Sequence, residues 1–163
     1  EDNLELSNGT KIHHSFIIFT GGIEASPITS QLDVDKNGRG QILVNEYLQT
    51  NKYPNIFAIG DIAEIKNKKG EIMPPNVTVA RISGTCAGKN ILAMIKNKKM
   101  TPCDPKLESI LIALGGKYAA GNLYGLVHVK GRIAYEIKKY VFSSYRKPLL
   151  QLIKAGYKKL KKL

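Results

Sequence analysis

A short apolar run that ends in glycine and aspartate constrains this chain more than any other feature. Residues 51–65 read NKYPNIFAIGDIAEI, and the run 55–59 begins after Pro54 and stops at Gly60. The run is too short for a helix, so we expect a buried strand. Ligands of open α/β sheets bind at the carboxyl ends of strands, and an ionised Asp61 placed there needs hydrogen-bond donors. A ligand rich in hydroxyl groups would supply them.

Two further segments point to the same kind of ligand. Residues 12–20 are predicted to form a strand that runs into Gly21 and Gly22, where a backbone can approach a ligand closely. Residues 77–95 are predicted to form a helix capped by Asn76, and the free N–H groups at its start favour negative charge. The three segments together suit a flavin nucleotide, with Asp61 accepting from the ribityl hydroxyls and the helix start near the ring.

The rest of the chain is predicted to contain short strands and a basic helical end. A strand is expected at 41–44, a hairpin-like excursion around Lys69 and Gly70, and a polar linker over 96–106. Two apolar strands are expected in 109–131, with turns or bulges at 115–116 and 121–122. The helix over 132–145 is expected to end before a second one that restarts at Pro148. The predicted domains are residues 1–97 and 98–163.

Several residue types give no site. Cys86 and Cys103 have neither CxxC spacing nor the pattern of a disulfide framework, so we expect a buried thiol and a loop thiol. Adjacent His13 and His14 would point to opposite faces of a strand, so no metal site is expected. The chain lacks an initiator methionine and opens on a hairpin-like turn at residues 7–9, so we expect it to be part of a longer protein.

The order of three segments resembles the C-terminal half of FAD-dependent pyridine nucleotide–disulfide oxidoreductases. The segments are FIIFTGGIEASP, GRGQILVNEYLQTNKYPNIFAIGDIA and PPNVTVARISGTCAGKNI. The subgroup that the chain resembles most is type II NADH dehydrogenase, and the stretch 107–150 is similar to that family's end. The fold class implied is α+β: the C-terminal remnant of an FAD/NAD(P)-binding, Rossmann-like domain, followed by a small strand pair and a helical membrane-docking module.

The resemblance implies a role for six residues at the cofactor. Asp61 would accept from the ribityl chain, and Gly60 would allow close approach. Thr20 and Gly22 would match the second FAD fingerprint at a strand end. Val77 and Thr78 would offer backbone N–H groups to the pyrimidine edge of the flavin. No catalytic acid or base is assigned, because the cofactor carries the chemistry, and no metal is expected.

Two departures from the family affect these expectations. Type II NADH dehydrogenases typically carry Ala-Gln-x-x-x-Gln at the start of this helix, where the matching positions here are Val77, Thr78 and Ile82. The electron acceptor therefore stays open between a quinone and other molecules. The family's first GxGxxG motif and its NADH-binding domain have no match in the chain. We therefore expect the chain alone to be inactive and its FAD site to be incomplete.

The last fifth of the chain carries most of the net charge. Residues 130–163 contain eleven Lys and Arg against one acid, Glu136, out of a net charge of +12 for the whole chain. At helical spacing, an apolar stripe opposes a lysine face, which is typical of an interfacial helix on anionic lipids. The residues predicted to bind the membrane are Leu149, Ile153, Lys154, Lys158, Leu160, Lys161 and Lys162. The alternative is a surface helix that packs on its own domain.

The function expected from the resemblance is that of a membrane-peripheral flavoprotein, on the cytoplasmic face of the cell membrane, passing electrons from NADH through FAD to a quinone. One alternative is a sulfide:quinone oxidoreductase-like flavoenzyme, although neither cysteine is well placed for that chemistry. Another is a non-enzymatic module that binds membranes or a partner through its basic end. A homodimer could cover apolar surface, and nucleic acid is not expected because no binding motif is present.

Overall fold

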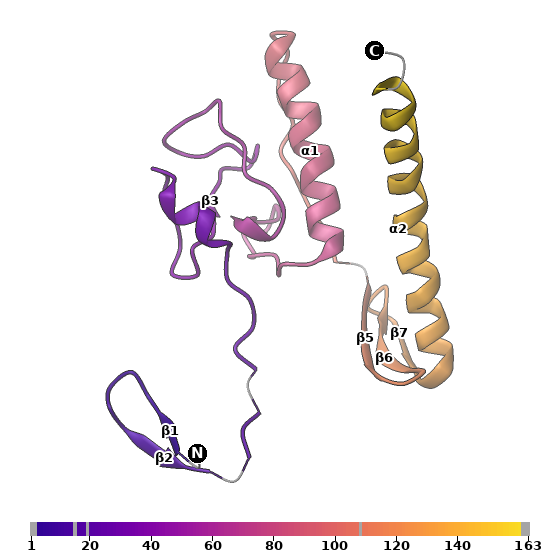
Figure 1. Ribbon diagram of the computed structural model, residues 1–163. Helices are drawn as coiled ribbons and strands as arrows, with labels where there is room; N and C mark the ends of the chain where they lie inside the picture. The colour runs from indigo at the N-terminus through magenta and orange to yellow at the C-terminus, as the bar shows by residue number, and fades with distance from the viewer. Residues whose placement is uncertain (1–2, 15, 19, 108, 161–163) are drawn as a thin grey trace. The chain divides into compact units, whose positions relative to one another are not determined.

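The chain divides into two units, residues 1–104 and 105–163 (Figure 1). The computed structural model describes residues 3–14, 16–18, 20–107 and 109–160. The division lies between residues 104 and 105, whereas the sequence placed a domain boundary between 97 and 98. The difference arises because the segment after residue 96 folds back onto the helix that precedes it.

The first unit begins with a hairpin. Strand β1 (Asn3–Glu5) pairs antiparallel with β2 (Lys11–His13), across a turn in which Gly9 adopts a φ of 82°. The predicted strand over 12–20 is wrong beyond His13, because the described residues from 14 to 24 have no regular structure. Phe16 is 80% exposed and Ile18 is 76% exposed. An apolar strand of this kind needs neighbouring strands to bond its backbone, and no described strand pairs with it.

Three loops in the first unit share one hydrogen-bonding pattern. In each, an asparagine Oδ1 accepts from the N–H groups two and four residues later, and its Nδ2 donates to the side chain four residues later. The loops start at Asn37, Asn45 and Asn67. The fourth residue of each has a positive φ: 72° at Gly40, 71° at Leu48 and 79° at Gly70. Asparagine side chains that bond their own backbone stabilise such turns.

The loops surround a small core and very short strands. Strand β3 (Ile42–Leu43) pairs parallel with β4 (Ala63–Glu64), which confirms part of the strand predicted at 41–44. The predicted buried strand over 55–59 is wrong: only a single bridge joins Phe57 to Gln49, although Ala58 is buried. The 3-10 helix η1 (Pro27–Gln31) precedes β3, and η2 (Gly60–Ile62) precedes β4.

Helix α1 (Val77–Ile95) has the bounds and the cap that the sequence predicts. The Val79 N–H donates to Asn76 Oδ1 over 3.0 Å. Buried positions recur at Val79, Ser83, Ala87 and Asn90, at helical spacing, so one face packs on the core. Small residues on this face allow close packing, which offsets their weak intrinsic helix propensity.

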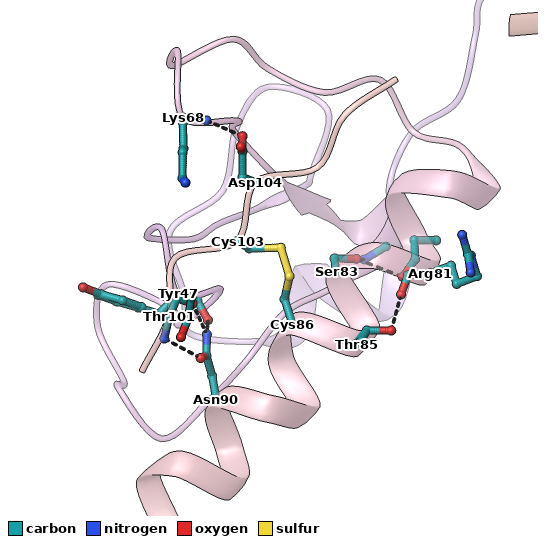
Figure 2. The surroundings of a disulfide bond; sticks show 12 residues. Tyr47, Lys68, Arg81, Ser83, Thr85, Cys86, Asn90, Thr101, Cys103 and Asp104 are labelled. Atoms are coloured by element: carbon teal, nitrogen blue, oxygen red, sulfur yellow. Dashed lines mark hydrogen bonds between the residues drawn. A yellow bond between two sulfur atoms is a disulfide. The ribbon is translucent and has the colours of Figure 1, made fainter. Parts of the chain in front are cut away.

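The segment after α1 returns along the helix and is fastened to it (Figure 2). Cys86 and Cys103 form a disulfide, with Cα atoms 5.7 Å apart, so the prediction of two free thiols is wrong. Asn90 Nδ2 donates to the carbonyl oxygens of Tyr47 and Thr101, and Asn90 Oδ1 accepts from the Thr101 N–H. Sequence spacing gave no sign of the pairing, because the fold-back of the chain brings the cysteines together.

The second unit is a three-stranded antiparallel sheet with one long helix. The strands are β5 (Ser109–Gly115), β6 (Tyr118–Leu123) and β7 (Val127–Lys130), in that order across the sheet. Two strands were predicted, with a turn at 121–122, but those residues lie inside β6, and the second turn follows Leu123. Helix α2 (Gly131–Leu160) packs on the sheet, where Ala119 and Ala134 are fully buried.

Helix α2 continues through Pro148, so the predicted break at that residue is wrong. Proline lacks the N–H that would bond the Ser144 carbonyl. Ser144 is exposed, so water can bond the carbonyl instead. Figure 1 shows that the sheet lies along the first half of α2 only, which leaves the basic second half without a sheet beneath it. None of the described helices is long and apolar enough to cross a membrane.

Candidate functional site

The Gly60–Asp61 turn lies against the first half of α1. Gly60 has a φ of 68°, which favours glycine, and a Cβ placed on it would lie 3.6 Å from Ala80 Cβ. The Gly60 N–H donates to Ser83 Oγ over 3.1 Å. Helix α1 and η2 are therefore in direct contact, and small residues on both sides allow it.

The Asp61 carboxylate has no partner among the described residues, although its backbone is held. The side chain is exposed and accepts no hydrogen bond from any residue that the structure describes. The Asp61 carbonyl accepts from Gln41 Nε2 over 3.1 Å. With respect to the described residues, the acceptor sites of the carboxylate are open, and its assignment to a cofactor stays a prediction.

The start of α1 offers backbone donors close to this turn. The Val79 N–H is taken by the Asn76 side chain and the Ala80 N–H by the Asn76 carbonyl. The Val77 and Thr78 N–H groups donate to no other described residue. The structure therefore brings four predicted cofactor residues to η2 and the adjoining half of α1: Gly60, Asp61, Val77 and Thr78.

The other two predicted cofactor residues are not brought to the turn. Thr20 and Gly22 are exposed, and a Cβ placed on Gly22 would meet no atom within 4 Å. Among the described residues, no hydrogen bond joins either of them to η2 or α1. Their assignment stays a prediction that depends on residues 12–20 finding strand partners.

The predicted membrane residues fall at the end of α2. Five of them, namely Leu149, Ile153, Lys154, Lys158 and Leu160, lie within the helix. Ile153 is 58% exposed. Lys161 and Lys162 lie outside the described residues. The predicted division into apolar and basic faces requires these residues to be helical, and the described ones are. Whether they bind a membrane stays a prediction.

Two residues of the candidate site were not predicted. Gln41 and Ser83 bond the backbone of Gly60 and Asp61 from separate parts of the chain. The only sequence signal for Gln41 is the asparagine–glutamine spacing of its loop. Ser83 stands out in the sequence only as one of several small residues on α1.

Asp33, Lys52 and Tyr53 form an exposed hydrogen-bonded cluster outside the candidate site. Lys52 Nζ and Tyr53 OH both donate to Asp33 Oδ2, the latter over 3.1 Å. These hydrogen bonds hold the pKa of the Asp33 carboxyl below its ordinary value, and the bond to Asp33 raises the pKa of Lys52. All three side chains belong to the loops around the core, so the cluster is assigned no part in ligand binding.

Comparison with known proteins gives the family. The sequence profile of the pyridine nucleotide–disulphide oxidoreductases matches residues 1–84. The chain is 31% identical over 123 residues to the type II NADH:quinone oxidoreductase of Haemophilus influenzae, covering 75% of this chain and 28% of that protein. It is 30% identical over 135 residues to the demethylphylloquinone reductase NdbB of Synechocystis, covering 83% of this chain and 33% of that protein.

The fold of the chain resembles part of a solved structure. The sulfide:quinone oxidoreductase of Aquifex aeolicus matches with a TM-score of 0.51 and 20% sequence identity, over 88% of this chain and 37% of that one. The chain spans about a third or less of the length of the Haemophilus and Synechocystis relatives. These matches agree with the Gly60–Asp61 turn and the helix that follows it: the chain belongs to the pyridine nucleotide–disulphide oxidoreductase family of flavoproteins.

Proposed function

We propose that this chain belongs to an NADH:quinone oxidoreductase and supplies one side of its FAD site together with its membrane-facing module. The observation that carries the proposal is the exposed Asp61 carboxylate, which no described residue bonds, on a turn held by Gln41 and by Ser83 of α1. The relatives named NADH:quinone oxidoreductase and demethylphylloquinone reductase support the same substrate classes. FAD, when bound, would accept electrons from NADH and pass them to a quinone.

The chain's own residues would bind and orient the cofactor. Asp61 would accept hydrogen bonds from the ribityl hydroxyls, and Gly60 would let the backbone approach them. The N–H groups of Val77 and Thr78, which donate to no described residue, would donate to the pyrimidine edge, where a helix N-terminus favours negative charge. Thr20 and Gly22 would join them once residues 12–20 pair with neighbouring strands.

The 163-residue chain alone is expected to hold FAD weakly and not to oxidise NADH. It contains no GxGxxG motif, and two of its six proposed cofactor residues are not gathered at the turn. The longer protein, encoded by this sequence and its upstream coding region, should purify yellow and reduce a quinone with NADH. A longer protein that stays colourless with added FAD would exclude the proposal.

Replacing Asp61 with alanine should weaken FAD binding by the longer protein about tenfold to a hundredfold. Each hydrogen bond to a charged group contributes about 1.5–3 kcal/mol, and 1.4 kcal/mol is a factor of about ten. The dissociation constant can be measured from quenching of flavin fluorescence. Asp35→Ala is the matched control, because Asp35 is also exposed and lies outside the candidate site. Equal affinities for the two variants would contradict the assignment.

We also propose that the end of α2 docks on the cytoplasmic face of the cell membrane. Residues 130–163 carry eleven Lys and Arg against one acid, and the apolar side chains of Leu150 and Ile153 are exposed on the helix. A homodimer and a quinone reached through the membrane surface are further expectations of this proposal.

Substituting both Lys154 and Lys158 with glutamine should weaken binding of the chain to anionic vesicles about thirtyfold. Each lysine near an anionic surface contributes roughly 1 kcal/mol, and glutamine keeps the helix propensity. Cosedimentation with vesicles that contain phosphatidylserine measures the effect. Glutamine at the exposed Lys68 and Lys69 removes the same charge from the first unit and should change little. Equal loss in both double variants would show a dependence on net charge only.

A further inference from the structure

We propose that Ser83 and Gln41 are positioning residues that hold the Gly60–Asp61 turn from two sides, so that the Asp61 carboxylate is presented in one place. The inference rests on the proposed role of Asp61 in binding FAD. It adds two residues from different parts of the first unit, neither of which is expected to touch the cofactor.

Ser83 fixes the turn to α1. Its side chain is fully buried, and its hydroxyl both accepts and donates a hydrogen bond. Ser83 Oγ accepts from the Gly60 N–H over 3.1 Å and donates to the Ala80 carbonyl over 3.0 Å. The hydroxyl proton therefore points along the helix, and the oxygen lone pair faces the turn. Loss of the hydroxyl would leave the Gly60 N–H without its partner.

Gln41 fixes the other side of the turn. It is 8% exposed, and its Nε2 donates to the Asp61 carbonyl over 3.1 Å. Its Oε1 accepts from Asn37 Nδ2 over 3.0 Å, and Asn37 Nδ2 also donates to Glu64 Oε2 over 2.9 Å. The asparagine therefore sets which end of the Gln41 amide faces Asp61.

The two hydrogen bonds hold backbone atoms of adjacent residues and do not involve the Asp61 carboxylate. The Gly60 N–H and the Asp61 carbonyl lie at the two ends of the Gly60–Asp61 pair, with the Cα atoms of both residues between them. With both ends held, the backbone of this pair has less freedom, and a ligand has to order mainly the side-chain torsions of Asp61. A site whose backbone is fixed beforehand loses less entropy on binding, so it binds more tightly.

The repeated loop supplies a matched control for Gln41. Gln49 occupies the same position in the second loop, is 6% exposed, and accepts from Asn45 Nδ2 as Gln41 accepts from Asn37. Its Nε2 donates to the Pro54 carbonyl instead of the turn. Gln41→Glu and Gln49→Glu therefore remove the same donor at the same burial, but only the first releases Asp61.

Amide hydrogen exchange on the 163-residue chain tests the fastening without any cofactor. Gln41→Glu and Ser83→Ala should each speed exchange at the bonded N–H groups of Gly60 and Ala63 at least threefold relative to Gln49→Glu. Thr85→Ala serves as the control for Ser83, because Thr85 makes only an exposed bond to the Arg81 carbonyl. Unchanged exchange in both site variants would overturn the inference, whatever the chain binds.

Flavin affinity of the longer protein tests the consequence. Gln41→Glu and Ser83→Ala should each raise the FAD dissociation constant about three- to tenfold, the size expected for one hydrogen bond. Gln49→Glu and Thr85→Ala should change it less than twofold. In an Asp61→Ala background, the two site variants should have almost no further effect, because they act through Asp61. A general loss of stability would persist in that background.

The outcomes separate this inference from the proposed function. No FAD binding by the wild-type longer protein overturns the proposed function and the role given to both residues. FAD binding that falls with Asp61→Ala but not with Gln41→Glu or Ser83→Ala overturns the positioning role alone. Equal effects of Gln41→Glu and Gln49→Glu also overturn it, because the matched loop would then account for the loss.

Discussion

Replacing Asn90 with alanine is expected to lower the free energy of unfolding of the first unit by about 3 kcal/mol. Asn90 is 2% exposed and makes three hydrogen bonds, to the Tyr47 carbonyl and to both backbone groups of Thr101. Each buried group left without a partner costs about 1–3 kcal/mol. These three bonds are only partly buried, since Thr101 is exposed and Tyr47 half-buried, so each lost bond is taken as about 1 kcal/mol.

Urea unfolding measures this change. A loss of about 3 kcal/mol should move the unfolding midpoint down by more than about 1 M. Lys89→Ala is the control, because Lys89 is the preceding residue of α1 and is exposed. If the Asn90→Ala variant is too unstable for a full unfolding curve, amide exchange at Thr101 can be measured in a stabilising buffer. Faster exchange at this N–H would show that the segment after α1 is less firmly held. Midpoints that agree within error for the two variants would show that the segment after α1 contributes nothing to stability.

The parts of the fold that the sequence predicts are those whose cause is local. The bounds and cap of α1 follow from Asn76 and the residues directly after it. The turn around Lys69 and Gly70 forms because Asn67 bonds its own loop. The runs 16–18 and 55–59 are apolar enough for strands. A strand also needs a neighbouring strand to hydrogen-bond its backbone, and the sequence pattern does not show whether one is present.

The candidate site divides in the same way. Gly60 and Asp61 can be predicted from the sequence because they follow directly on an apolar run. Gln41 and Ser83 act on backbone atoms 20 and 23 residues away, respectively, so no local pattern marks them. The repeated asparagine loop was also hidden, because Leu48 takes the position with positive φ that glycine fills in the other two copies. Leu48 is 1% exposed, so its burial offsets the strained backbone.

Reducing the Cys86–Cys103 disulfide is expected to lower the stability of the first unit by roughly 3 kcal/mol. The two cysteines are 17 residues apart in sequence, and a closed loop of about that length restricts the unfolded chain by this amount. Thermal unfolding with and without a dithiol should show the difference in the wild-type chain. The double variant Cys86→Ser/Cys103→Ser should resemble the reduced protein and ignore the dithiol. A wild-type chain with the same unfolding temperature in both conditions would show that the bond contributes nothing.

The redox state of the same disulfide in the cell tests which compartment the first unit faces. Reducing compartments keep most thiols of cytosolic proteins unpaired, and Cys103 is only 3% exposed, so reduction requires the segment after α1 to open. A protein docked on the cytoplasmic face would then depend on Asn90 to keep that segment in place. Alkylation of thiols in intact cells, followed by mass measurement, reads the state directly. Two alkylated cysteines agree with the proposed cytoplasmic face, and they predict that Asn90→Ala is more damaging in the cell than in the oxidised protein. Unalkylated, paired cysteines would place the first unit in an oxidising compartment and contradict that location.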